Sequence, residues 1–169
     1  MNNTTVPNMR PVVEQITNNA TSWVGHRPGD KKETVSGQTF IAPTSGLLGT
    51  IEVYSTMVTH PGKVVMSLHT FDPGQNTWGP VLGSTSVELI YSDTNKWISF
   101  NIPGLQLEKG RTYGFKMESP DSYFGVGEAA GSSKKPPFTT GQEWRFTANN
   151  QKGDSFSYLS LAFKVGLRA

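Results

Sequence analysis

The feature that most constrains the fold is an alternation of apolar and polar residues with a period of two, repeated in short runs along the chain. In one run Ile98, Phe100 and Ile102 share a face, and in another Leu159 and Leu161 do so. This spacing places successive side chains on opposite faces of a β-strand. Turn-forming residues separate the runs, because the 169 residues include 18 Gly and 11 Pro. The sequence therefore predicts short strands joined by turns.

The pattern predicts about nine strands and no helical crossover between them. They are expected at residues 39–42, 47–57, 63–71, 86–92, 96–102, 111–118, 123–127, 143–148 and 157–166. A loop over 72–80, rich in Pro and Gly, interrupts the pairing before the strand resumes near Val81. Strands joined without helices pair antiparallel. We therefore expect an all-β fold, an antiparallel two-sheet β-sandwich of jelly-roll type, with a closed barrel as the alternative.

The chain divides into two regions of different composition. Residues 1–37 are rich in Asn and Thr and contain turn signals, which predicts an N-terminal arm or irregular lead-in. Residues 38–169 carry the regular alternation and form the predicted sandwich domain.

Charge and composition exclude several classes of function. The 15 Lys and Arg residues nearly balance 13 Asp and Glu residues, and a net charge of +2 is too small for a nucleic-acid-binding surface. The sequence has no apolar run long enough to cross a membrane, so we expect no membrane insertion. It also has no cysteine and no signal-peptide core near its start. The cellular compartment stays open on these grounds.

Four sequence fragments resemble a known group of proteins. They are Gln38–Gly46, Trp97–Phe100, Leu107–Tyr113 and Asp154–Tyr158. In order and spacing they resemble a diffuse family of carbohydrate-binding-like β-sandwich modules found in bacterial surface, secreted and phage-associated proteins. The resemblance covers roughly residues 38–165 and implies a sandwich fold, a sugar-binding role and an extracellular, cell-surface or virion location.

No catalytic motif is found in the sequence. The three histidines, His26, His60 and His69, lie in a loop, a Pro-Gly turn and a strand, without a partner motif. Neither a nucleophile elbow nor a zinc-protease motif is present. We therefore expect that the protein is not an enzyme and has no catalytic residues.

Asp72 and Asn76 weakly indicate a metal ion, as do Asp93 and Asn95 in a second loop. Their oxygen atoms are of the kind that binds Ca²⁺, and β-sandwiches hold Ca²⁺ in such loops. An Asp-Pro-Gly sequence is also typical of a tight turn, in which the Asp side chain accepts backbone hydrogen bonds. We favour the turn and predict no metal site, with Ca²⁺ as the alternative.

Aromatic residues in the loops are the best candidates for ligand binding. Flat rings stack on the apolar face of a sugar, while amides and charged groups bind its hydroxyls. Trp78 with Asn76, Trp144 with Arg145, and Tyr123 fit this description, provided that the fold brings them together. The alternative is that these rings close the end of the sandwich and have a purely structural role.

The sequence thus favours a non-catalytic binding module whose ligand is a carbohydrate. The alternative is a structural or assembly protein, such as a phage or cell-surface component. In that case the N-terminal arm and a sheet surface would hold subunits of a homo-oligomer together.

Overall fold

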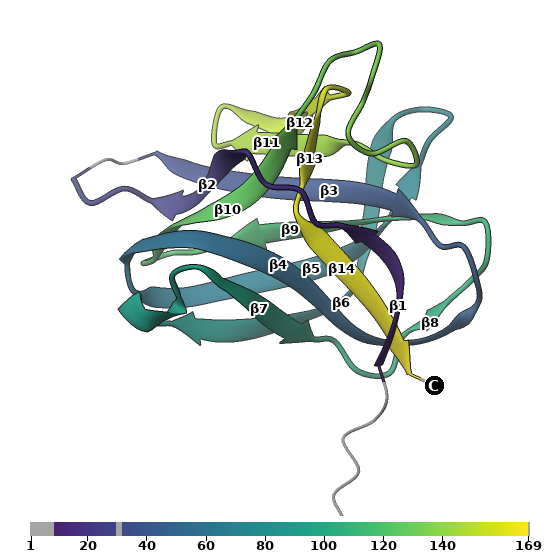
Figure 1. Ribbon diagram of the computed structural model, residues 1–169, viewed down its shortest axis with the longest axis horizontal. Coiled ribbons are helices and arrows are strands. Elements are labelled where there is room, and N and C mark those ends of the chain that lie inside the picture. Colours follow the sequence, from purple (N-terminus) through teal and green to yellow (C-terminus); the bar gives the residue numbers. More distant parts are fainter. Residues whose placement is uncertain (1–8, 30–31, 169) are drawn as a thin grey trace, which may run out of the picture.

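The computed structural model describes residues 9–29 and 32–168 of the chain, and these residues are almost entirely β (Figure 1). One short 3-10 turn, η1 (Tyr91–Asp93), joins two of the strands. The strands in chain order are β1 (Met9–Gln15), β2 (Ala20–His26), β3 (Glu33–Ile41), β4 (Gly46–His60), β5 (Gly62–Asp72), β6 (Thr77–Leu89), β7 (Lys96–Asn101), β8 (Gln106–Leu107), β9 (Thr112–Glu118), β10 (Tyr123–Ala130), β11 (Glu143–Thr147), β12 (Asn150–Phe156), β13 (Leu159–Leu161) and β14 (Phe163–Arg168). This described part contains no helix with the length and apolarity of a membrane span.

All strand pairs are antiparallel and belong to one curled, hydrogen-bonded network of 14 strands within the described residues. Its main path runs β1-β14-β4-β10-β2-β3-β9-β5-β6, and the β11–β12 hairpin joins the edge of β3. The long strand β4 changes partner along its length, from β14 at residues 48–53 to β10 at 55–60. The all-β, antiparallel prediction is therefore confirmed. The expected count of nine strands is wrong, and the division into two separate sheets is not confirmed.

The region predicted as an arm, residues 1–37, contributes strands to the sheet. Strand β1 pairs with β14 of the same chain, and β2 pairs with β10 and β3. The expected boundary at 37/38 lies inside β3, which continues through Ile41. The strands within residues 9–29 and 32–37 are therefore part of the sheet and not an irregular lead-in, because they contain no Asn and pair with strands distant in sequence. Residues 1–8 lie outside the described residues.

The hydrophobic core lies on the inner face of the curled sheet. Its largest fully buried rings are Phe40, Phe100, Phe115, Phe124 and Phe163. Each of these rings comes from a different strand. Phe115 on β9 and Phe100 on β7 belong to the alternating apolar residues of the sequence pattern. The other face of the same strands is free to carry polar and functional side chains.

The loop expected at 72–80 is shorter than predicted. Strand β5 continues to Asp72 and β6 begins at Thr77, so that only a tight turn remains between them. Asn76 has a left-handed backbone conformation, with φ of 56°. Pro80 lies within β6, where it is tolerated because β6 is the last strand of the main path. Trp78 therefore lies on a strand of the sheet.

Candidate functional site

The strand register places a row of side chains straight across five strands. Trp144 of β11 lies opposite Gly37 of β3, Gly37 lies opposite Lys116 of β9, and Lys116 lies opposite Ser67 of β5. Ser67 in turn lies opposite Ser84 of β6. Directly opposed residues of antiparallel strands point to the same face. The row therefore forms one continuous surface on the face opposite the core.

Four aromatic rings gather on this surface. Trp78 contacts Phe71, Trp144 and Phe146 with its edge or face, at centroid distances of 5.7, 5.8 and 5.4 Å. Trp144 and Phe146 also stack, with centroids 6.0 Å apart. Edge-to-face pairs at this spacing are favourable contacts. The rings come from β5, β6 and β11, so their meeting depends on the fold.

Two glycines make room for the Trp78 ring above the strands. A Cβ on Gly114 of β9 would overlap the six-membered ring of Trp78, and a Cβ on Gly37 would lie 3.2 Å from it. Any larger residue at position 114 would therefore push the ring away from the sheet. Close approach of a side chain to a backbone is one of the roles that only glycine fills in a strand.

Lys116 extends over these rings from β9. Its Nζ atom lies 4.2 Å from the ring centroid of Phe146 and 4.9 Å from that of Trp78. Both distances are within the range of a cation–π interaction. Burial lowers the pKa of Lys116, and the charge of Glu118 opposes this change. The ammonium group is thus a partly desolvated cation on an aromatic surface.

His69 of β5 lies beside Lys116 and is held by two hydrogen bonds. Its Nδ1 atom is 3.0 Å from the carbonyl oxygen of Gly79, and its Nε2 atom is 2.9 Å from Oγ of Ser67. Burial lowers the pKa of His69, which favours the neutral ring. A carbonyl oxygen only accepts, so Nδ1 carries the proton and Nε2 accepts a hydrogen bond from the serine hydroxyl. The imidazole is therefore a fixed, uncharged part of the surface.

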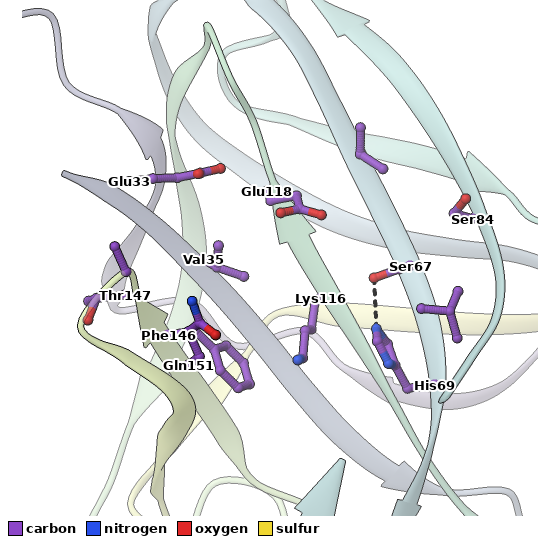
Figure 2. A pocket seen from close by; sticks show the side chains of 13 residues that line it. Glu33, Val35, Ser67, His69, Ser84, Lys116, Glu118, Phe146, Thr147 and Gln151 are labelled. Atoms are coloured by element: carbon purple, nitrogen blue, oxygen red, sulfur yellow. Dashed lines mark hydrogen bonds between the residues drawn. The ribbon is translucent and has the colours of Figure 1, made fainter. Parts of the chain in front are cut away.

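These groups line two adjoining hollows, which share His69, Lys116 and Gln151. The hollows have volumes of about 580 and about 570 Å³. Figure 2 shows the first of them, with Lys116 reaching between Phe146 and His69. We call the joined hollows the Trp78 groove, defined by Trp78, Trp144, Phe146, His69, Lys116 and Gln151.

Three of the predicted ligand-binding residues line the Trp78 groove. Trp78, Asn76 and Trp144 border its second hollow, together with Gln75 and Lys152. Trp144 is only 3% exposed, so the groove is bordered by a largely buried ring there. Within residues 9–29 and 32–168, the indole N–H groups of both tryptophans are buried without a hydrogen-bond partner. Unpaired buried donors are costly and uncommon in folded proteins.

Tyr123 lies on a different surface of the molecule. Its ring stacks on that of Trp23, with centroids 4.8 Å apart and planes inclined by 10°. The pair borders a hollow of about 420 Å³ with Arg27 and Thr59. We call this the Trp23–Tyr123 surface. Tyr123 therefore does not join Trp78, Asn76 and Trp144, but it shares a second hollow, of about 300 Å³, with Trp23 and Arg145.

Arg145 also points away from the Trp78 groove, because it alternates with Trp144 along β11. Its Nη2 atom lies 3.4 Å from Oε2 of Glu128 and 3.5 Å from Oε2 of Glu143. Glu143 is fully buried, and burial together with the neighbouring Glu128 raises the pKa of Glu143 to about 9. At neutral pH the carboxyl group of Glu143 therefore stays protonated beside one arginine. Arg145 is engaged in this cluster.

The hydrogen bonds of Asp72 fit the turn interpretation. Its Oδ1 atom accepts from the backbone N–H groups of Gly74 and Gln75, at 2.9 and 3.2 Å. These bonds are those of an Asp that caps its own turn. In the described ranges 9–29 and 32–168, no three His, Cys, Asp or Glu side chains gather in a way that suits a metal ion.

Sequence reasoning missed several residues of the groove. Lys116, His69, Phe146 and Gln151 were given no role in binding. The alternation of Tyr113, Phe115 and Met117 does imply that Lys116 faces away from the core. The register that places Lys116 between strands β3 and β5 is set by long-range pairing, which a single strand pattern does not contain.

Comparison with known proteins finds similarity only in fold. No protein-family model matches the chain, and no curated protein matches it. A solved structure of the clostridial cysteine protease Cwp84 after propeptide cleavage is similar, with a TM-score of 0.56 and 11% sequence identity. A crystal structure of the cysteine protease and lectin-like domains of Cwp84, a surface layer associated protein of Clostridium difficile, gives a TM-score of 0.51 at 11% identity.

The match covers most of this chain and the smaller part of the other chains. It spans 95% of this chain and 40% of the first structure, and 85% of this chain and 37% of the second. At 11% identity the likeness shows the fold alone. Because this chain has no cysteine, it cannot supply the thiolate of a cysteine protease.

Proposed function

We propose that the protein is a non-catalytic carbohydrate-binding module and that the Trp78 groove binds the sugar. The observation that carries this proposal is the gathering of aromatic rings, amides and a lysine in one hollowed surface opposite the core. Trp78 supplies a partly exposed ring, and Gln75, Asn76 and Gln151 supply amide groups. A sugar needs both kinds of contact.

The fold comparison supports the same proposal. One of the similar structures contains a lectin-like domain of a surface protein. A β-fold of this kind hosts many functions, so the argument for sugar binding depends on the residues of the groove.

The first test is a glycan-array screen of the purified protein with light scattering on the same sample. We expect the protein to bind a defined group of glycans on the array. We expect light scattering to show a small particle, not a large assembly. No retention of any glycan would contradict the proposal. A defined large oligomer without retention would favour the assembly alternative.

Two variants then locate the site on any glycan that is retained. Asn76→Gly removes the amide and keeps the left-handed backbone, since glycine adopts it readily. Trp78→Phe keeps an aromatic ring but reduces the stacking area. We expect each to weaken binding about threefold to tenfold, measured by titration calorimetry.

Trp97→Phe is the matched control, because Trp97 also carries a lysine over its ring but lies on β7. Nζ of Lys164 lies 4.2 Å from its centroid. We expect unchanged affinity for this variant. Equal loss of affinity in Trp97→Phe and Trp78→Phe, at equal thermal stability, would contradict the assignment of the Trp78 groove.

A further inference from the structure

Among residues 9–29 and 32–168, Lys116 forms no ion pair with a carboxylate. The four ion pairs within the described residues involve His26, Arg111 and Arg145, and none of them includes Lys116. Glu118 lies two residues away on the same strand and acts on Lys116 only through its charge. A half-buried charge without a direct ion-pair partner is costly in a folded protein. A bound anion would relieve that cost.

The two hollows of the Trp78 groove differ in charge. Glu33 and Glu118 line the first hollow with Lys116. The second hollow is lined by Lys116 and Lys152 and, among the described residues, by no Asp or Glu. His69 is common to both and is uncharged at neutral pH for the reasons given above. An anionic group is therefore favoured in the second hollow.

The second hollow also contains the groups that would hold the rest of a sugar. Trp78 and Trp144 line it, and so do Gln75, Asn76 and Gln151, which carry amide groups. Lysine is a compact cation with three donors and suits a carboxylate or sulfate. The ring contacts hold the ammonium group of Lys116 over the rings of Trp78 and Phe146. The charged and the apolar contacts thus belong to the same part of the groove.

We propose that the Trp78 groove selects an acidic carbohydrate, whose carboxylate or sulfate binds between Lys116 and Lys152 in the second hollow. This inference rests on the proposed carbohydrate-binding function and adds the class of ligand. The sugar ring beside the anionic group would contact Trp78, and its hydroxyls would bind the neighbouring amides.

The test compares charged glycans with their neutral counterparts. The probes are oligogalacturonate and the same oligomer after carboxyl reduction, and chondroitin sulfate before and after desulfation. We expect the wild-type protein to bind at least one charged probe about tenfold or more tightly than its neutral form, which corresponds to about 1.4 kcal/mol. The affinity should fall as NaCl is raised, because salt screens the charge. A difference in affinity between oligogalacturonate and its reduced form would indicate that the groove binds a carboxylate. A difference between chondroitin sulfate and its desulfated form would indicate that it binds a sulfate.

Lysine variants connect this preference to the groove. Lys116→Gln should remove most of the preference for the charged probe, and Lys116→Arg should keep it. Lys164→Gln, which removes the matched lysine over Trp97, should leave it unchanged. Thermal unfolding of all three variants checks that the fold is intact.

The outcomes separate the two proposals. Binding of neutral glycans with equal or higher affinity than charged ones, and unchanged by Lys116→Gln, would overturn the inference while the proposed function stands. Failure to retain any charged or neutral glycan would overturn both. A preference for charge that Lys164→Gln removes and Lys116→Gln does not would place the anion elsewhere and overturn the inference.

Discussion

The Trp78 groove and the Trp23–Tyr123 surface each contain a tryptophan beside another aromatic ring, but Trp78 and Trp23 contact their neighbouring rings differently. In the Trp23–Tyr123 surface two rings lie parallel at 4.8 Å, so each covers a face of the other. In the Trp78 groove the contacts of Trp78 with its neighbouring rings are edge-on, and a lysine lies over its face. Stacking two rings against each other closes a surface, whereas edge contacts leave ring faces for other groups.

The comparison also shows how register assigns function along one strand. On β11, Trp144 and Phe146 turn toward the groove, while Glu143 and Arg145 turn to the other side. A shift of one residue in the pairing of β11 with β3 would exchange these two sets. The groove therefore depends on the pairing of Trp144 with Gly37.

The largest expected effect comes from Trp144→Ala. The sequence made Trp144 a candidate for ligand binding, but a ring that is 3% exposed and packed against three others is also structural. We expect a loss of about 3–5 kcal/mol in the free energy of unfolding, measured by urea denaturation. Tyr123→Ala, on the other surface, should cost about half as much or less. Equal losses would show that the two surfaces are equally packed.

Glu143→Gln tests the other face of β11 through the pH dependence of stability. The pKa of Glu143 is raised from an ordinary 4.5 to about 9, so the folded state binds more protons than the unfolded state between these values. The stability that depends on this proton is complete below pH 4.5 and is lost as pH rises toward 9.

A glutamine stays neutral throughout this range. We expect Glu143→Gln to match the wild type near pH 4.5 and to be more stable by about 4 kcal/mol at pH 8. The measurement is urea denaturation at a series of pH values. Glu108→Gln, in the exposed pair with Arg111, should change stability by less than about 0.5 kcal/mol at any pH. Parallel curves for Glu143→Gln and the wild type would contradict the assigned proton.

A smaller effect is expected from Gly114→Ala, which displaces the Trp78 ring. Its matched control is Gly125→Ala, because Gly125 lies opposite Trp23 of the other aromatic surface and a Cβ there would crowd Thr21 and Thr56. We expect each to cost about 1–2 kcal/mol of stability. Only Gly114→Ala should also weaken glycan binding in titration calorimetry. Equal loss of glycan binding in Gly114→Ala and Gly125→Ala would contradict the assignment of sugar binding to the Trp78 groove alone.

The sequence predicts the class of the fold and part of the site. Alternation along β7, β9 and β14 separates core from surface, because a strand has a strict period of two. Trp78 and Asn76 line the same hollow, as expected of residues two positions apart in the sequence. Lys116 was missed because its contacts come from β6 and β11, and strand pairing over such distances leaves no local trace. Tyr123 was grouped with Trp78 on residue type alone.

The most direct measurement is an NMR titration of the four indole N–H signals with a glycan identified by the array. Each tryptophan gives one signal, and the four lie in different settings: Trp78 and Trp144 in the groove, Trp23 on the stacked surface and Trp97 on β7. We expect the signals of Trp78 and Trp144 to shift in a saturable way while those of Trp23 and Trp97 stay in place. A saturable shift of Trp23, with Trp78 and Trp144 unchanged, would contradict the assignment of sugar binding to the Trp78 groove.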